Sequence, residues 1–185
     1  MPTKPKTNQP ETPKEVQGRD TFQTPNYATE LLIPFIPKDT KFIWEPACGD
    51  FKISTVLCHH GYEVITTDLK YGDDFLQSYQ LPIAVKAIIT NPPYSLKQKF
   101  YQKCRQYKIP FALLIPADYY GWIIQALMDG CEKIIPTRRI DYITPNGKDG
   151  KNSTSQFHTM WLTWGFNLGK SETFVELTKE MKSNI

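Results

Sequence analysis

The sequence lacks the features that mark membrane-spanning, secreted and metal-binding proteins. No apolar run approaches the length needed to cross a bilayer, and no apolar segment near the start resembles a signal peptide. The four cysteines stand singly, without CxxC spacing, so neither a zinc site nor a disulfide framework is predicted. We therefore expect a soluble, intracellular protein with reduced thiols and no bound metal.

The glycine-rich loops of common nucleotide sites are missing as well. No G-x-x-x-x-G-K sequence occurs, and the full G-x-G-x-x-G pattern is absent because Phe51 and Lys52 stand where further small residues would be needed. A nucleoside triphosphate is therefore disfavoured as a ligand. The chain also has no internal repeat.

The length of 185 residues, of which 40% are hydrophobic and 13% aromatic, supports one sizeable core. Residues 1–20 are rich in Pro, Thr, Lys and Gln without periodicity, so we predict a disordered tail. We assign residues 21–170 to a single domain. Residues 171–185 are polar and only weakly helical in pattern, and we assign them to a C-terminal tail.

Apolar periodicity predicts alternating strands and helices. Helices are expected at 26–35, 53–60, 96–107 and 121–128, and strands at 41–45, 63–67, 85–90, 111–115, 133–136 and 158–165. This alternation favours an α/β fold whose mostly parallel sheet is covered on both faces. The last strand is expected to run antiparallel at the edge of that sheet.

The stretch Asn91-Pro92-Pro93-Tyr94 follows a predicted buried strand and carries the most informative chemistry of the chain. Its prolines restrict the backbone and leave carbonyl oxygens without competing N–H groups. The Asn91 amide oxygen and the Pro92 carbonyl can then both accept from an exocyclic amine, while the Tyr94 ring lies against the face of a base. A proline turn that merely closes a buried strand is the alternative.

A second stretch, Glu45-Pro46-Ala47-Cys48-Gly49-Asp50, stands at the carboxyl end of the first predicted strand. Ligands of open α/β sheets bind at this end of the strands. The small residues allow a ligand to approach closely, and the acids suit a cationic amino group better than a phosphate. A tight strand-to-helix turn without a ligand is the alternative.

Acidic residues follow the second predicted strand. Asp68 stands where a carboxylate can accept hydrogen bonds from both hydroxyls of a ribose, and a surface aspartate in an ordinary turn is the alternative. A little further on, Asp74 and Phe75 supply an acceptor and an apolar face for an adenine ring. The order of the two turns and Asp68 favours a nucleoside ligand.

These motifs, with Thr24-Pro25 ahead of them and Leu76 after Phe75, resemble the motif series of S-adenosylmethionine-dependent amino-group DNA methyltransferases. Specifically, the chain resembles the N6-adenine group, in the small forms that phages and mobile elements carry. The resemblance covers residues 22–116 well and the later chain only in general pattern. It implies a class I, Rossmann-like three-layer sandwich in the cytoplasm of a bacterium or a phage-infected host cell.

The resemblance also implies an activity: transfer of a methyl group from S-adenosylmethionine to the N6 amine of adenine in DNA, which leaves S-adenosylhomocysteine. The target base is flipped out of a duplex or presented in a single strand. The implied reaction site comprises Asn91, Pro92, Pro93 and Tyr94. The implied cofactor-binding residues are Thr24, Tyr27, Glu45, Pro46, Ala47, Cys48, Gly49, Asp50, Asp68, Asp74 and Phe75.

The chain departs from the family pattern in three ways. Between Asp68 and Asp74 it is too short for a crossover helix and a return strand, so one helix and one strand are expected to be missing or vestigial. Phe51 stands where relatives often have a small residue. There is no room for a separate target-recognition domain, which predicts a short or relaxed target or help from a second subunit.

Basic residues provide two candidate contacts with nucleic acid within a net charge of +3. The helix predicted at 96–107 carries several lysines, which an ordinary solvated face explains better. Arg138 and Arg139 precede a loop at 145–155 that contains Lys148 and Lys151 and is rich in Gly, Asn and Ser. This loop can close over a nucleic-acid backbone, and a plain flexible hairpin is the alternative.

Other functions remain open. Enzymes that methylate RNA or a protein glutamine amide carry a similar turn, whereas Thr24-Pro25 and the absence of an N-terminal helical domain favour DNA adenine. A catalytically silent nucleic-acid-binding module of the same fold is a further alternative. The intact Asn91 and Tyr94 argue against it, and the shortened cofactor half leaves it open.

Overall fold

A single sheet organises the computed structural model, which describes residues 22–119, 121–143 and 157–183. Its strands are β1 (Phe42–Glu45), β2 (Glu63–Thr66), β3 (Ala87–Thr90), β4 (Phe111–Pro116), β5 (Glu132–Pro136), β6 (Thr159–Trp164) and β7 (Glu172–Val175). Within the described residues they form a seven-stranded sheet in the order β2-β1-β3-β4-β6-β5-β7. All pairs are parallel except those of β6, which is antiparallel to β4 and β5.

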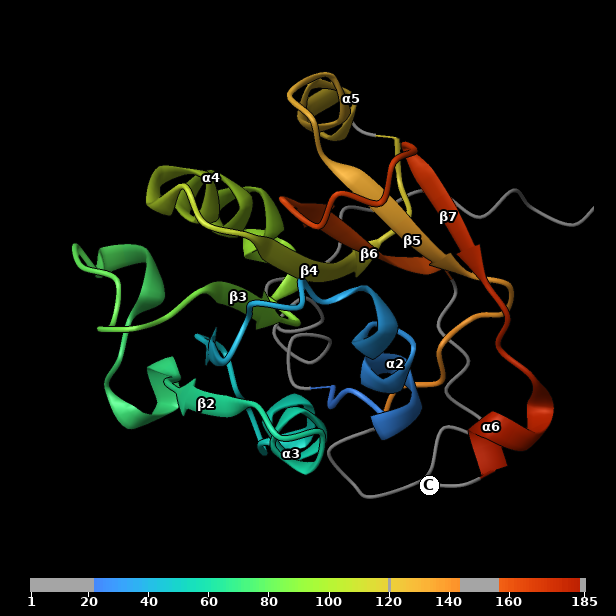
Figure 1. The fold of residues 1–185 in the computed structure, drawn as a ribbon, viewed down its shortest axis with the longest axis horizontal. Helices are drawn as coiled ribbons and strands as arrows, with labels where there is room; N and C mark the ends of the chain where they lie inside the picture. Colours follow the sequence, from blue (N-terminus) through green and yellow to red (C-terminus); the bar gives the residue numbers. More distant parts are fainter. Residues whose placement is uncertain (1–21, 120, 144–156, 184–185) are drawn as a thin grey trace, which may run out of the picture.

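Helices cover both faces of this sheet (Figure 1). On one face lie α4 (Lys97–Tyr107) and α5 (Gly121–Met128), and on the other α2 (Asn26–Glu30) and α3 (Lys52–His59). Shorter elements are η1 (Ile33–Phe35), η2 (Leu69–Tyr71), η3 (Phe75–Gln77), η4 (Tyr94–Leu96) and α6 (Lys179–Ser183). The arrangement confirms the predicted α/β three-layer fold with a mostly parallel sheet.

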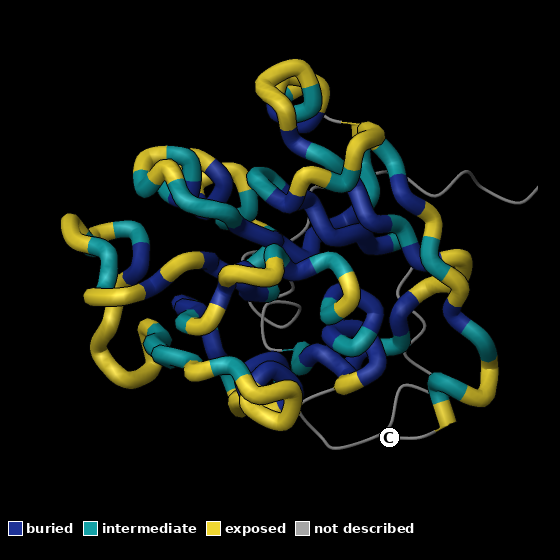
Figure 2. Tube along the Cα trace, in the orientation of Figure 1, coloured by how far each residue is buried: buried dark blue, intermediate teal, exposed yellow. Residues whose placement is uncertain are grey.

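Adjacent residues of the central strands pack into opposite layers, as the two-residue period of a strand requires. Ile43 and Leu114 belong to the core on the α2 and α3 side, whereas Trp44 and Leu113 belong to the core under α4. Every residue of β3 and β4 is buried. Figure 2 shows this buried centre, with exposed residues on the outer turns and on α5. The rigid part of the molecule is therefore the middle of the sheet.

The chain between Asp68 and Asp74 was predicted to be too short for a crossover, and the segment between β2 and β3 indeed contains no strand. All of its residues are described, and they form only the single turns η2 and η3. This segment is largely exposed (Figure 2), and β2 is consequently an edge of the sheet. The helix and strand expected to be missing are missing.

The other side of the sheet differs from the prediction. The antiparallel strand β6 lies between β4 and β5, and so it is interior instead of at the edge. The sheet also extends beyond residue 170, where the sequence predicted a tail, because β7 pairs in parallel with β5. Lys133 of β5 is 2% exposed and forms an ion pair with Glu172 of β7. The four residues of β7, Glu-Thr-Phe-Val, are too few to show a clear strand period, which explains why it was missed.

Trp161 connects the sheet to α2, and we expect Trp161→Phe to be strongly destabilising. The side chain is fully buried, and its indole Nε1 donates to the Ala28 carbonyl oxygen at 2.9 Å. Phenylalanine would leave a space and remove the donor, at a cost of about 2 to 3 kcal/mol in the free energy of unfolding. Urea denaturation followed by circular dichroism measures the loss. Trp122→Phe, at a half-buried position on α5, is the control, and equal losses in both variants would contradict this role.

Candidate functional site

The ends of β1, β2 and β3 bring the three predicted motifs to one edge of the sheet. Because β1 pairs in parallel with both β2 and β3, the carboxyl ends of all three strands lie together. Glu45 is the last residue of β1, Asp68 follows β2, and Asn91 directly follows β3. The structure thus gathers turns that are far apart in the sequence.

The Asp68 carboxylate fastens the turn after β1 to the end of β2. Its Oδ2 accepts from the Gly49 N–H at 2.8 Å, and its Oδ1 accepts from the Lys70 N–H at 2.9 Å. The Cys48 N–H donates to the Thr67 carbonyl at 3.1 Å in the same place. Each carboxylate oxygen can accept a further hydrogen bond, so Asp68 can hold this turn and still receive hydroxyl groups from a ligand.

Gly49 is required by the shape of that turn. Its φ is +52°, and an added Cβ would lie 2.7 Å from the Gln23 side-chain oxygen. The same Gln23 oxygen accepts from the Asp50 N–H at 3.0 Å, and the Gln23 backbone pairs with Ile143. Gln23 therefore closes the turn from a distant segment, a role that the sequence did not reveal.

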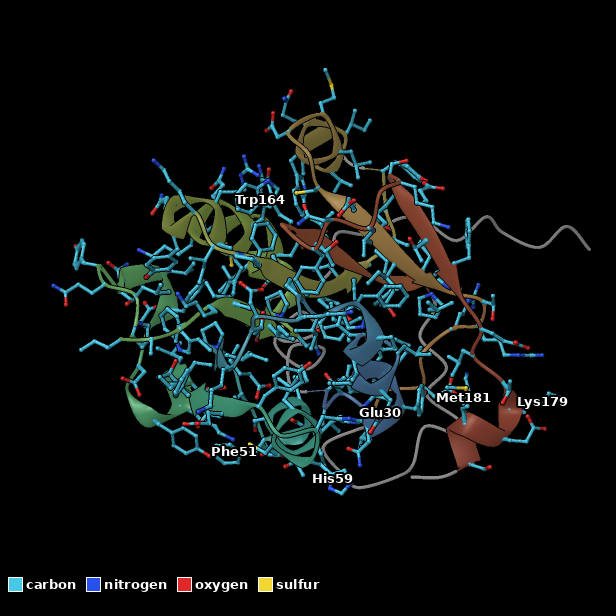
Figure 3. The ribbon with its side chains drawn as sticks, in the orientation of Figure 1. Glu30, Phe51, His59, Trp164, Lys179 and Met181 are labelled. Atoms are coloured by element: carbon cyan, nitrogen blue, oxygen red, sulfur yellow. The ribbon has the colours of Figure 1, made fainter. Side chains whose placement is uncertain are left out.

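The acidic turn already holds a cation. The Lys70 ammonium donates to the Gly49 carbonyl and to Asp50 Oδ1, the latter at 3.1 Å. It also lies 4.9 Å from the centre of the Tyr71 ring, which stacks on Phe51. Phe51 stands at the start of α3 (Figure 3) in the left-handed region, at φ 61°. The Gly49 carbonyl and the Asp50 carboxylate thus act as acceptors for an ammonium group in this structure.

Glu45 is the most perturbed acid of the site. It is 1% exposed, and its Oε2 accepts no hydrogen bond from any residue that the structure describes. Burial raises the pKa of this carboxyl to about 8, an effect that the negative charge of Asp68 reinforces and hydrogen bonding with Ser54 partly offsets. The carboxyl is therefore mostly neutral near pH 7.

The small residues of the turn are enclosed to different degrees. Pro46 and Cys48 are buried, and Ala47 is half-buried. Burial raises the pKa of the Cys48 thiol to about 11, so it remains protonated. These residues shape the floor of the turn, and Gly49 and Asp50 form its accessible part.

The reaction turn presents an amide acceptor and an aromatic ring. Asn91 Oδ1 is shielded from solvent and has no hydrogen-bond donor among the described residues. Tyr94 is half-buried, and its hydroxyl donates to the hydroxyl of Tyr142 at 2.7 Å. The Tyr94 ring also meets Phe157, with ring centres 5.7 Å apart and an interplanar angle of 66°. Neither Tyr142 nor Phe157 carries a local sequence signal for this contact.

The two prolines of the turn are also enclosed. Pro92 is buried and Pro93 is half-buried before the single turn η4. The Pro93 carbonyl accepts from the Leu96 N–H at 2.8 Å, which closes that turn. Burial of Pro92 and the hydrogen bond to the Pro93 carbonyl therefore both fix the conformation of the turn.

Four further predicted cofactor-binding residues differ in burial: three are buried and one is exposed. Thr24 and Tyr27 are 3% and 4% exposed, and the Tyr27 hydroxyl accepts from the Asp141 N–H at 2.8 Å. Asp74 is exposed and accepts from the Leu76 N–H at 2.9 Å, where it caps η3. Phe75 is 3% exposed. Its ring packs on Trp44 and Phe100 at 5.1 and 4.8 Å between ring centres, so it faces the core instead of the open edge.

Two of the four basic residues predicted to contact nucleic acid can be placed. Arg138 and Arg139 are exposed and follow β5 after one intervening residue, Thr137. Since β4 and β5 are both antiparallel to β6, β5 ends at the same edge of the sheet as β3 and β4. Lys148 and Lys151 lie outside the described residues.

The described parts of the chain contain neither a helix long and apolar enough to cross a bilayer nor a group of three His, Cys, Asp or Glu side chains arranged to hold a metal ion.

No protein-family model and no curated protein sequence matches this chain. Two solved structures share its fold. A protein assigned as an RNA methyltransferase from Pyrococcus horikoshii is 15% identical, with a TM-score of 0.56 over 77% of this chain and 84% of the other. A methyltransferase subunit of a type I restriction-modification system from Streptococcus thermophilus is 12% identical, with a TM-score of 0.54 over 92% of this chain. The chain spans 54% of that subunit. The protein therefore has the Rossmann-like fold of methyltransferases.

The raised pKa of Glu45 predicts a particular dependence of stability on pH. As pH rises from about 4.5 to about 8, the unfolded chain releases this proton before the folded chain does, so folding stability falls over that window and levels off above it. We expect Glu45→Gln to remove a decline of up to about 5 kcal/mol in the free energy of unfolding. Urea titrations of both proteins at a series of pH values test this. Parallel stability curves for wild type and variant would contradict the assignment.

Proposed function

We propose that the protein transfers a methyl group from S-adenosylmethionine to the N6 amine of adenine in DNA. The observation that carries this proposal is the solvent-shielded Oδ1 of Asn91, which has no donor among the described residues. A buried acceptor without a donor costs about 1 to 3 kcal/mol, so an arrangement of this kind is expected where a ligand supplies the donor. An exocyclic amine supplies it.

The residues at the end of β1 and β2 fit the cofactor. Glu45 Oε2 is a second buried acceptor without a donor in the described chain. The Gly49 carbonyl and Asp50 hold the Lys70 ammonium in this structure and would accept from the amino group of the cofactor in its place. Asp68 would accept from the ribose hydroxyls. When bound, the cofactor supplies an electrophilic methyl group on a sulfonium.

The remaining cofactor contacts follow from the resemblance. Asp74, which is exposed beside the turn, would accept from the amine of the cofactor's adenine. Phe75 would support the adenine site from the core side, because its ring packs in the core under α4. Thr24 and Tyr27 would support the turn from the α2 side.

The reaction needs acceptors more than it needs a base. The adenine N6 lone pair is delocalised into the ring, and attack on the methyl group places positive charge on the nitrogen. The Asn91 oxygen and the Pro92 carbonyl would accept the two N–H groups and stabilise that charge, because they are fixed before the base arrives. Tyr94 would stack on the flipped base, a contact worth about 1 to 3 kcal/mol. The proton is lost easily after methylation.

DNA is the proposed polymer, and Arg138 and Arg139 are its proposed phosphate contacts. Both are exposed and follow a strand that ends at the edge where Asn91 lies. Cations in that position would hold the backbone next to the flipped base. A second subunit would supply further target recognition.

Asn91→Ala tests the reaction site. We expect it to lower kcat at least about 100-fold and to change the Kd of S-adenosylmethionine by less than about twofold, because Asn91 stabilises charge that develops only during transfer. Radiolabelled methyl incorporation into DNA, RNA and protein, with the methylated product identified, measures turnover. Calorimetry measures cofactor binding.

Gln98→Ala, an exposed change nearby on α4, is the matched control and should retain full turnover. Retained turnover in Asn91→Ala would refute the assignment of this site. Product found as methylated RNA or methylated glutamine would replace the DNA substrate with the one found. No product with any polymer would favour a silent binding module.

Asp68→Ala tests the cofactor turn. The change removes the ribose acceptor and the hydrogen bond that holds Gly49, so we expect the calorimetric affinity for S-adenosylmethionine to fall at least about tenfold. Asp73→Ala, at an exposed aspartate of the same segment, is the control and should bind normally. An unchanged affinity in Asp68→Ala would exclude the ribose role.

A further inference from the structure

Tyr94 of the reaction turn is attached to a residue that the motif pattern does not include. Its hydroxyl donates to the hydroxyl of Tyr142 at 2.7 Å, and the two rings meet edge to face with centres 6.3 Å apart. Tyr142 is only 5% exposed. Burial raises the pKa of its hydroxyl to about 12, so it stays protonated and neutral.

The segment that carries Tyr142 is itself held on both sides. The Asp141 N–H donates to the Tyr27 hydroxyl at 2.8 Å, and the Asp141 carboxylate accepts from Lys182 of α6 at 2.8 Å. On the other side, Ile143 exchanges two backbone hydrogen bonds with Gln23, at 2.9 and 3.0 Å. Tyr142 is thus a fixed anchor, and Tyr94 is the residue whose position the bond determines.

The same segment also reaches the cofactor turn. The backbone partner of Ile143 is Gln23, whose side-chain oxygen accepts from the Asp50 N–H. Residues 140–143 therefore contact the reaction turn through the Tyr142 hydroxyl and the cofactor turn through Gln23. The two contacts are separable, because the Tyr142 side chain makes one and the backbone of Ile143 makes the other.

We propose that Tyr142 is a positioning residue whose hydroxyl holds the Tyr94 ring in the orientation that receives the flipped base. This inference rests on the proposed function of the Asn91 turn. A tyrosine on a turn has several rotamers of similar energy, and fixing one of them before the base arrives lowers the entropic cost of stacking. Tyr142 does not touch the reacting atoms and acts through Tyr94.

The hydrogen bond between the two hydroxyls predicts a characteristic mutational pattern. Removing either one breaks the same bond, so Tyr94→Phe and Tyr142→Phe should each lower kcat/KM for the polymer about fivefold to tenfold. The kcat/KM of the double variant should be no lower than that of the less active single variant, because either single change already breaks the bond. The KM for S-adenosylmethionine should stay within about twofold, since Gln23 still holds the cofactor turn.

The experiment compares wild type, both single variants and the double variant by steady-state methyl transfer, with urea unfolding of all four proteins. Tyr101→Phe is the control. Tyr101 is 8% exposed and packs on Phe111 and Trp122 in the layer under α4 and α5, so loss of its hydroxyl should leave kcat/KM unchanged. Non-additive effects of the Tyr94 and Tyr142 changes, in both kinetics and unfolding, support the proposal.

The failure of each idea has its own result. Turnover unaffected by Tyr142→Phe, or effects that multiply in the double variant, would overturn the positioning role and leave the proposed function standing. A rise in the KM of S-adenosylmethionine as large as the fall in kcat/KM for the polymer would also overturn the positioning role. Such a rise would indicate a general disturbance of the site. Absence of methyl transfer by the wild-type protein with DNA, RNA and protein would overturn the proposed function, and the positioning role with it.

Discussion

The parallel pairing of β1 with β2 on one side and β3 on the other is the constraint on which the site depends. It places the ends of three strands at one edge, so that Asp68 can accept from the Gly49 N–H and Asn91 can lie beside the same turn. The buried centre of the sheet makes this pairing rigid, since β3 is buried along its whole length. Loss of the usual further strand shortens the sheet beyond β2 and leaves this three-strand unit intact.

The chemistry at the carboxyl ends of β1, β2 and β3 follows from buried acceptor atoms that have no hydrogen-bond donor among the described residues. Glu45 Oε2 and Asn91 Oδ1 are both shielded acceptors that no described residue satisfies, and the Lys70 ammonium occupies the accessible part of the acidic turn. Acceptors of this kind are costly in an empty site and favourable beside amines and a sulfonium. The neutral state of Glu45 lowers that cost, because its raised pKa keeps the carboxyl uncharged near pH 7.

Local patterns in the sequence were sufficient to predict β1, β2 and β3 and the three turns that follow them. The strands that end at Glu45, near Asp68 and just before Asn91 are apolar runs followed by distinctive turns. The short link after Asp68 predicted the missing strand. Long-range contacts gave no such signal. Tyr142 meets Tyr94 across 48 positions, and Gln23 meets Asp50 across 27. β7 was missed because it is a four-residue strand of mixed polarity that is attached through its pairing with β5. The ring of Phe75, a predicted ligand contact, packs in the core.

The central claim is that the ends of β1, β2 and β3 form one site that faces a methyl donor toward Asn91. A crystal structure of the protein with S-adenosylhomocysteine tests it most directly. The account predicts ribose hydroxyls within hydrogen-bond distance of the Asp68 carboxylate, the amino group at the Gly49 carbonyl in place of the Lys70 ammonium, and the sulfur directed toward Asn91. S-adenosylhomocysteine bound elsewhere on the molecule, or oriented with its sulfur away from Asn91, would contradict it.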